Sequence, residues 1–233
     1  MLAGGRGTRL KPFTFAFPKP LVPIGDVPIL EILVQQLRHA GITRITMAVG
    51  HLAELIMAYF SNGRFADLTI DYCREPHPLG TAGPLALVPN LDERFLVLNG
   101  DLLTTLDFAD MVQRHVASGA VATIGAYTKE LKIDLGVLEI DAAGTLQGYI
   151  EKPTHTYRVS MGVYVFEPEV LALLKPGEHC DLPDLMRRLL DAKKVINVYP
   201  FAGFWRDIGR PEDYASAVEE FERLRPLLLP ATE

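Results

Sequence analysis

Apolar and polar positions alternate along the first half of the chain in a way that predicts helices and strands in turn. From Pro28 to Ala40 apolar residues recur at helical spacing, and Gly41 supplies a stop signal. A short apolar strand follows at once, and the alternation continues to Tyr127. The expected strands are 44–49, 68–73, 95–98 and 121–127, and the expected helical stretches are 28–40, 52–60, 82–88 and 108–118. Such an alternation is typical of an α/β protein with a Rossmann-like, doubly wound and mostly parallel mixed sheet.

The pattern of the second half predicts shorter strands joined by turns. Two apolar segments, 137–140 and 146–150, flank a turn at Asp141-Ala-Ala-Gly144 and read as a hairpin. Further expected elements are a strand at 162–166, helices at 167–174 and 182–191, a strand at 195–199 and a last helix from Pro211 to about Leu224. No linker is visible, so we expect a single domain over 1–233, with halves at about 1–120 and 121–233.

Composition narrows the class of protein. The 233 residues are 48% hydrophobic and 22% charged, which is ordinary for a globular protein. With 23 basic and 29 acidic residues the net charge is -6, which argues against nucleic acid as a partner. No leader or membrane-spanning run is visible, and two cysteines provide no disulfide framework. We therefore expect a soluble cytoplasmic protein without a membrane partner.

A glycine-rich loop, Ala3-Gly-Gly-Arg-Gly-Thr-Arg-Leu10, opens the chain. Its glycines let the backbone turn sharply and bring N–H groups close to an anion. Thr8 adds a hydroxyl donor, and Arg9 and Lys19 add two cations. The loop is neither a Walker A motif, because no Gly-Lys-Ser/Thr follows Gly7, nor G-x-G-x-x-G, because Leu10 stands at the last glycine. The glycine-rich loop and these basic residues together predict a binding site for a nucleoside triphosphate.

Three polar segments each follow an expected strand, at residues 3–9, 74–84 and 99–101. Because ligands of such sheets bind beyond the carboxyl ends of the strands, the three segments are expected to meet in one crevice.

Six motifs together resemble those of the sugar-1-phosphate nucleotidylyltransferases. They are Ala3–Leu10, Pro18–Pro23, Pro78–Pro84, Asn99–Asp101, Glu151–Pro153 and Trp205–Gly209, and they cover nearly the whole chain. The resemblance implies the nucleotide-diphospho-sugar transferase fold and transfer of a nucleotide to a sugar 1-phosphate with release of pyrophosphate. It also implies Mg²⁺, held by Asp101 and Asp207.

The same resemblance assigns roles to single residues. Arg9 would stabilise the β- and γ-phosphates, Lys19 would contact the α-phosphate and Lys152 would orient the sugar phosphate, with Asp101 as the fourth catalytic residue. Because a sugar phosphate oxygen is already ionised at pH 7, no general base is needed. The expected nucleotide-binding residues are Leu2, Ala3, Gly4, Gly5, Gly7, Thr8, Glu75, Pro78, Gly80 and Thr81, and the expected sugar-binding residues are Gly136, Glu151, Lys152, Ser160 and Met161.

Only a few residues indicate which nucleobase and which sugar the protein would bind. A carboxylate at Glu75 can accept two hydrogen bonds from guanine, whereas uracil and thymine offer one donor and adenine presents an acceptor. The run from Pro78 is similar to that of mannose-1-phosphate guanylyltransferases, which also favours GTP. Ser160-Met161-Gly162 stands where many relatives carry Asn-Ala-Gly. Mannose 1-phosphate and a manno-heptose 1-phosphate both stay open, because they share ring stereochemistry.

Other readings stay open. One is the same chemistry with UTP or dTTP and a glucose-type or amino-sugar 1-phosphate. Another is a regulatory subunit without activity that binds a nucleotide sugar. The apolar tail Pro226–Pro230 could pack on a second copy, so a homodimer is a further expectation. Only Met1 and Leu2 precede the glycine-rich loop, so a late start or a truncation is expected to shorten the first strand and expose its neighbours' edges.

Overall fold

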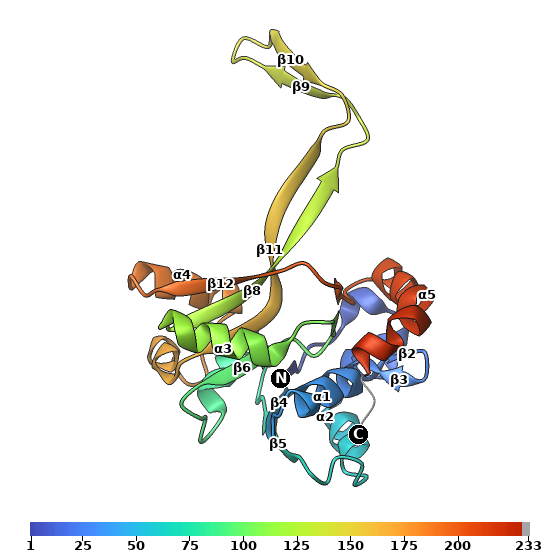
Figure 1. Ribbon diagram of the computed structural model, residues 1–233, viewed down its shortest axis with the longest axis vertical. Helices are drawn as coiled ribbons and strands as arrows, with labels where there is room; N and C mark the ends of the chain where they lie inside the picture. The colour runs from blue at the N-terminus through green and yellow to red at the C-terminus, as the bar shows by residue number, and fades with distance from the viewer. Residues whose placement is uncertain (230–233) are drawn as a thin grey trace.

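The computed structural model of the chain describes residues 1–229 (Figure 1). Its centre is a mixed sheet in two parts, with strand orders β1-β4-β5 and β12-β8-β11-β6. A parallel bridge between Leu2 and Asn99 joins the parts, so that β1 lies beside the end of β6. The strands are β1 (Leu2–Ala3), β4 (Arg44–Val49), β5 (Thr69–Arg74), β6 (Phe95–Leu98), β8 (Ala122–Lys132), β11 (Thr154–Phe166) and β12 (Ile196–Phe201).

Both faces of the sheet are covered. In β6, Val97 and Leu98 belong to different buried clusters, because successive side chains of a strand point to opposite faces. The cluster that contains Leu98 also contains residues of α1 (Ile29–His39), α2 (Ala53–Phe60) and α3 (Phe108–Ser118). The cluster that contains Val97 includes residues of α4 (Leu182–Asp191). This layering confirms the predicted doubly wound α/β fold.

A third cluster ties the two ends of the chain together. Phe221 of α5 (Pro211–Leu228) is buried with Leu10 and Ile24. The strand pair β2 (Pro23–Ile24) and β3 (Val27–Pro28) contacts α5, and β7 (Leu102–Thr104) pairs with β13 (Trp205–Asp207). In the predicted apolar tail, Leu228 is buried and Leu227 is exposed, so the tail covers its own core in part. Pro230, the last residue of that tail, lies outside the described residues.

Two predicted helices, 82–88 and 167–174, are short 3₁₀ turns, η4 (Gly83–Leu87) and η5 (Pro168–Leu173). At the first, the N–H groups of Ala82 and Gly83 donate to the carbonyl of Cys180, at 2.8 and 3.0 Å, so they are held from outside the segment. Three more 3₁₀ turns lie near the start of the chain, η1 (Thr8–Leu10), η2 (Phe13–Phe15) and η3 (Lys19–Leu21). Within residues 1–229, the helices are all too short or too polar to cross a membrane.

The largest difference from the predicted elements is a long ribbon. Strand β11 begins at Thr154, ahead of the expected 162, and β8 continues to Lys132, so the two strands pair far beyond the body of the sheet. The predicted hairpin, β9 (Val137–Ile140) and β10 (Leu146–Ile150), sits at the end of this ribbon. We call residues 128–158 the arm, and Figure 1 shows it projecting from the rest of the molecule.

Two adjacent leucines of α4 give a matched test of the packing. Leu189 is 1% exposed against the sheet, whereas Leu190 is 61% exposed on the other side of the helix. Leu189→Ala should lower the free energy of unfolding by about 2–5 kcal/mol, because it removes buried methyl groups and leaves a cavity. Leu190→Ala should change it by roughly 0.5 kcal/mol or less. Urea unfolding of both variants checks this, and equal losses would contradict the assigned packing.

Candidate functional site

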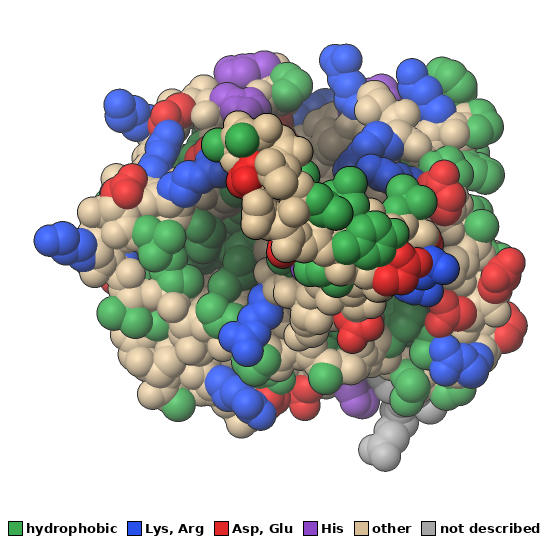
Figure 2. Space-filling view, turned by 90° about the horizontal axis from the view of Figure 1, so that it is seen from above, with side chains coloured by type: hydrophobic (Ala, Val, Ile, Leu, Met, Phe, Trp, Pro, Cys, Tyr) green, Lys and Arg blue, Asp and Glu red, His purple; other side chains and the backbone are tan. Residues whose placement is uncertain are grey.

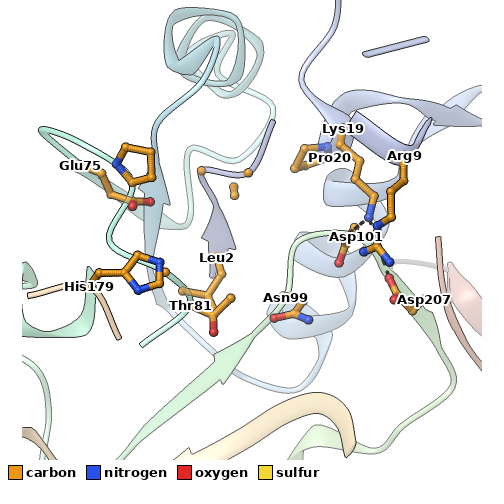
Figure 3. Close-up of a pocket in the computed structure, with 15 residues that line it drawn as sticks. Leu2, Arg9, Lys19, Pro20, Glu75, Thr81, Asn99, Asp101, His179 and Asp207 are labelled. Atoms are coloured by element: carbon orange, nitrogen blue, oxygen red, sulfur yellow. Dashed lines mark hydrogen bonds and ion pairs between the residues drawn. The ribbon is translucent and has the colours of Figure 1, made fainter. Parts of the chain in front are cut away.

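A cavity of about 380 Å³ lies beyond the carboxyl ends of β1, β5 and β6 (Figure 3). Residues from both halves of the chain line it. Twelve of the residues predicted from the sequence are among them: Leu2, Ala3, Gly4, Gly5, Arg9, Lys19, Glu75, Pro78, Gly80, Thr81, Asp101 and Asp207. The three polar segments that follow strands thus meet in one place.

The glycine-rich loop is held in shape by its own residues. Gly7 has a φ of +59°, and a Cβ there would lie 2.8 Å from the Cβ of Lys19. The Leu10 N–H and the Thr14 hydroxyl both donate to the carbonyl of Gly7, at 2.9 and 2.8 Å. Gly7 and Thr8 do not line the cavity, but their conformation places Gly4 and Gly5 at its wall.

Strand pairing brings the two carboxylates of the site together. Asp101 follows β6, and the register of β7 with β13 sets Asp207 opposite Leu102. The Ile208 N–H donates to the carbonyl of Asp101 at 3.0 Å. Two aspartates that are more than a hundred residues apart in the sequence therefore face the same end of the cavity, as Figure 3 shows.

Lys19 lies between these carboxylates. It is 8% exposed, forms an ion pair with Asp101, and has its Nζ 3.9 Å from Oδ1 of Asp207. Burial raises the pKa of Asp207, and the charge of Asp101 raises it further, against the opposing effects of Lys19 and Arg9. The two cations beside Asp207 therefore offset the effect of its burial only in part.

One oxygen of this cluster finds no partner in the part of the chain that the structure describes. Oδ1 of Asp101 is buried and accepts no hydrogen bond from the described residues. An unpaired buried acceptor is costly, so a cation or a donor is expected to reach it. Within residues 1–229, no three His, Cys, Asp or Glu side chains gather at metal-binding distance. Two carboxylates suit a hard divalent ion such as Mg²⁺, which commonly takes one or two carboxylates and completes its shell with phosphate and water.

The opposite end of the cavity is built around Glu75. Its N–H donates to the carbonyl of Val49 at 3.0 Å, and its Oε2 accepts from the Leu79 N–H at 3.1 Å. The carboxylate lies against Gly4, where a Cβ would collide with Oε1. Burial raises the pKa of Glu75. A side chain held in this way presents its carboxylate to the cavity.

Thr81 is fixed from the second half of the chain. Its N–H and its hydroxyl donate to Oδ1 of Asp181, at 2.9 and 3.2 Å, and its hydroxyl oxygen accepts from the Leu182 N–H at 2.7 Å. The start of α4 is thus attached to the wall of the cavity.

Three lining residues were not predicted as site residues: Pro20, Asn99 and His179. Asn99 belongs to the Asn-Gly-Asp motif and could have been inferred from it. The sequence around His179 carries no such motif. His179 reaches the cavity through a contact between distant parts of the chain, in which the N–H of the neighbouring Cys180 donates to the carbonyl of Leu79 at 2.9 Å.

The five predicted sugar-binding residues are not brought into the cavity. Gly136, Glu151 and Lys152 lie on the arm, and the Lys152 side chain is 56% exposed with its Nζ 3.9 Å from Oε1 of Glu151. Met161 is fully buried in the core, and the Ser160 hydroxyl lies 2.9 Å from that of Tyr164. The structure therefore gathers the residues predicted for the nucleotide and the metal and leaves those for the sugar elsewhere.

Comparison with known proteins gives the family. Residues 1–223 match the family described as Nucleotidyl transferase. A UTP–glucose-1-phosphate uridylyltransferase of Synechocystis is 36% identical over 94% of this chain and 61% of its own length. A probable mannose-1-phosphate guanylyltransferase 3 of Oryza sativa subsp. japonica is 33% identical over 94% of this chain and 63% of its own. The chain thus spans less than two thirds of these relatives.

Solved structures agree. HddC from Yersinia pseudotuberculosis is similar with a TM-score of 0.74 and 27% identity, over 94% of this chain and 97% of that one. The same protein complexed with GMP-PN is similar with a TM-score of 0.71 and 26% identity, over the same shares of both chains. Together with the cavity of Figure 3, the family match over residues 1–223 shows that this chain belongs to the nucleotidyl transferase family.

Proposed function

We propose that the protein transfers a nucleoside monophosphate, with GTP as the favoured donor, to a mannose- or manno-heptose-type sugar 1-phosphate. The products are a nucleotide sugar and pyrophosphate. The observation that carries the proposal is the cluster of Lys19, Asp101 and Asp207, which lines one cavity together with residues of the glycine-rich loop.

The chain's own residues would act mainly by neutralising charge. The loop N–H groups and Arg9 would hold the β- and γ-phosphates, and Lys19 would face the α-phosphate. An ionised oxygen of the sugar phosphate would form a bond to the α-phosphorus while the bond to the β-phosphate oxygen breaks, and the electron pair would leave with pyrophosphate.

A bound Mg²⁺ would be held by Asp101 and Asp207, and it would supply further positive charge against the phosphate oxygens. The unpaired Oδ1 of Asp101 and the raised pKa of Asp207 both support a cation at this position.

Glu75 supports guanine as the base, because its partly buried carboxylate lies at the end of the cavity away from the acidic cluster (Figure 3). Relatives named as mannose-1-phosphate guanylyltransferases and the neighbouring structure complexed with GMP-PN support it too. A second candidate is UTP with glucose 1-phosphate, favoured by the name of the Synechocystis relative. A regulatory subunit without activity is less well supported, since Arg9, Lys19 and Asp101 share the cavity.

Asp101→Asn tests the reaction. It keeps the side chain's shape and removes its charge, so turnover with GTP, mannose 1-phosphate and Mg²⁺ should fall about 100-fold or more. Pyrophosphate release measures this. Asp191→Asn, at the exposed end of α4, is the matched control and should leave turnover unchanged. Near-normal turnover of Asp101→Asn would refute the proposed role, and a wild-type protein silent with every pairing of the four NTPs and the sugar 1-phosphates would refute the function.

Glu75→Gln tests the choice of base. An amide oxygen replaces one carboxylate oxygen and an NH₂ group replaces the other, so one of the two acceptors for guanine becomes a donor. We expect kcat/KM with GTP to fall roughly 10- to 100-fold, and that with UTP to change much less. Glu54→Gln, an exposed change on α2, serves as the control. An equal fall with both nucleotides would mean that Glu75 supports the wall of the cavity and does not select the base.

A further inference from the structure

His179 lines the cavity but has no part in the roles described so far. Figure 3 shows its side chain on the same side of the cavity as those of Glu75 and Thr81, away from Asp101 and Asp207. His179 is exposed, but exposure alone does not mark a functional histidine, because Figure 2 shows histidine side chains at the surface seen from above. What distinguishes His179 is its place on the cavity wall.

The backbone that carries His179 is held on both sides. Before it, the carboxylate of Glu178 accepts two hydrogen bonds from the guanidinium of Arg188, at 2.7 and 3.2 Å. After it, Cys180 lies against Gly80, which has a φ of +78° and where a Cβ would lie 2.5 Å from the Cys180 carbonyl oxygen. This part of the wall is therefore set before a ligand binds, which lowers the entropic cost of a contact there.

His179 also supplies a hydrogen-bond donor beside Glu75. Within the described residues, five lining side chains can donate a hydrogen bond: Arg9, Lys19, Thr81, Asn99 and His179. Arg9 and Lys19 lie at the acidic end of the cavity, and Asn99 lies between the two ends (Figure 3). The Thr81 hydroxyl already donates to Oδ1 of Asp181 at 3.2 Å. The imidazole, which carries at least one N–H in either charge state, is left as the side-chain donor on the side of Glu75.

A purine presents different groups on two adjacent edges. On guanine, the edge with the N1–H and N2 amino donors suits the carboxylate of Glu75, and the adjacent edge carries the acceptor N7. A planar base that turns its first edge to Glu75 therefore offers N7 to a neighbouring part of the wall. Adenine has the same N7, whereas uracil and thymine have none. A donor to N7 would select purines, and Glu75 would then select guanine among them.

We propose that the imidazole of His179 donates a hydrogen bond to N7 of the nucleobase and so selects purine over pyrimidine nucleotides. The inference rests on the proposed function for the presence of a nucleotide in this cavity. It deepens that function by naming a second side chain that reads the base. Because His179 would touch the base and not the phosphates, its loss should raise KM and leave kcat nearly unchanged.

Removing N7 from the nucleotide tests the contact. In 7-deaza-GTP a C–H group replaces N7, so the wild-type kcat/KM with mannose 1-phosphate and Mg²⁺ should be roughly 3- to 10-fold lower than with GTP. His179→Ala should show the same fall with GTP, no further fall with 7-deaza-GTP and little change with UTP. His39→Ala, at the exposed end of α1, is the matched control and should keep the full preference for GTP over 7-deaza-GTP.

A purely structural role would give another pattern. If His179→Ala lowered kcat/KM with GTP and 7-deaza-GTP by the same factor, His179 would only support the wall, and the inference would be overturned. A wild-type protein that used both nucleotides equally well would overturn it too. Equilibrium binding of the two nucleotides gives the same ratio without turnover. A protein that prefers GTP in binding but releases no pyrophosphate would support the contact and count against the proposed function, and one that binds no GTP would contradict both.

Discussion

The site depends on the burial of Lys19 beside Asp101. Removing two charges from water costs free energy that their attraction repays only in part, so such a pair is poor evidence for stability. Here the pair is joined by Asp207, whose pKa is raised by burial, and one oxygen of Asp101 has no partner among residues 1–229. An arrangement that is electrostatically incomplete in the free protein is well suited to a ligand that brings both phosphates and a cation.

Holding these charges in place requires the two ends of the chain to be packed together. Lys19 follows the glycine-rich loop, and Asp207 ends β13. Leu10, Ile24 and Phe221 pack together in one buried cluster. The packing there is tight, because a Cβ at Gly25 would lie 2.8 Å from the Phe221 ring. Because the interior is close-packed, a shift of α5 would be transmitted to both sides of the ion pair. The last helix is therefore part of what positions the first loop.

Local sequence predicts the strands and helices of this protein that bury one face or both faces in the core. The strands at 44–49 and 95–98 were predicted with the bounds observed, since apolar runs between turn signals leave little choice. The hairpin at the tip of the arm is predicted, but its stem is not, because residues 128–132 and 154–158 are mostly polar and exposed and carry no apolar pattern that marks a strand. His179 was missed for another reason: its place in the cavity depends on a backbone hydrogen bond between Cys180 and Leu79, a hundred residues away.

The two carboxylates whose pKa values are raised stand at opposite ends of the cavity. Burial is the main cause for both Glu75 and Asp207. A carboxyl group whose pKa is higher in the folded than in the unfolded state costs stability above that pKa, and the cost is relieved as the pH falls. The free protein therefore carries two such costs at neutral pH. A guanine edge would donate hydrogen bonds to one carboxylate and a divalent cation would pair with the other, so a single metal-bound nucleotide would relieve both. On the proposed function, the cavity would in this sense be complementary to a whole nucleoside triphosphate with its metal, and not to phosphate alone.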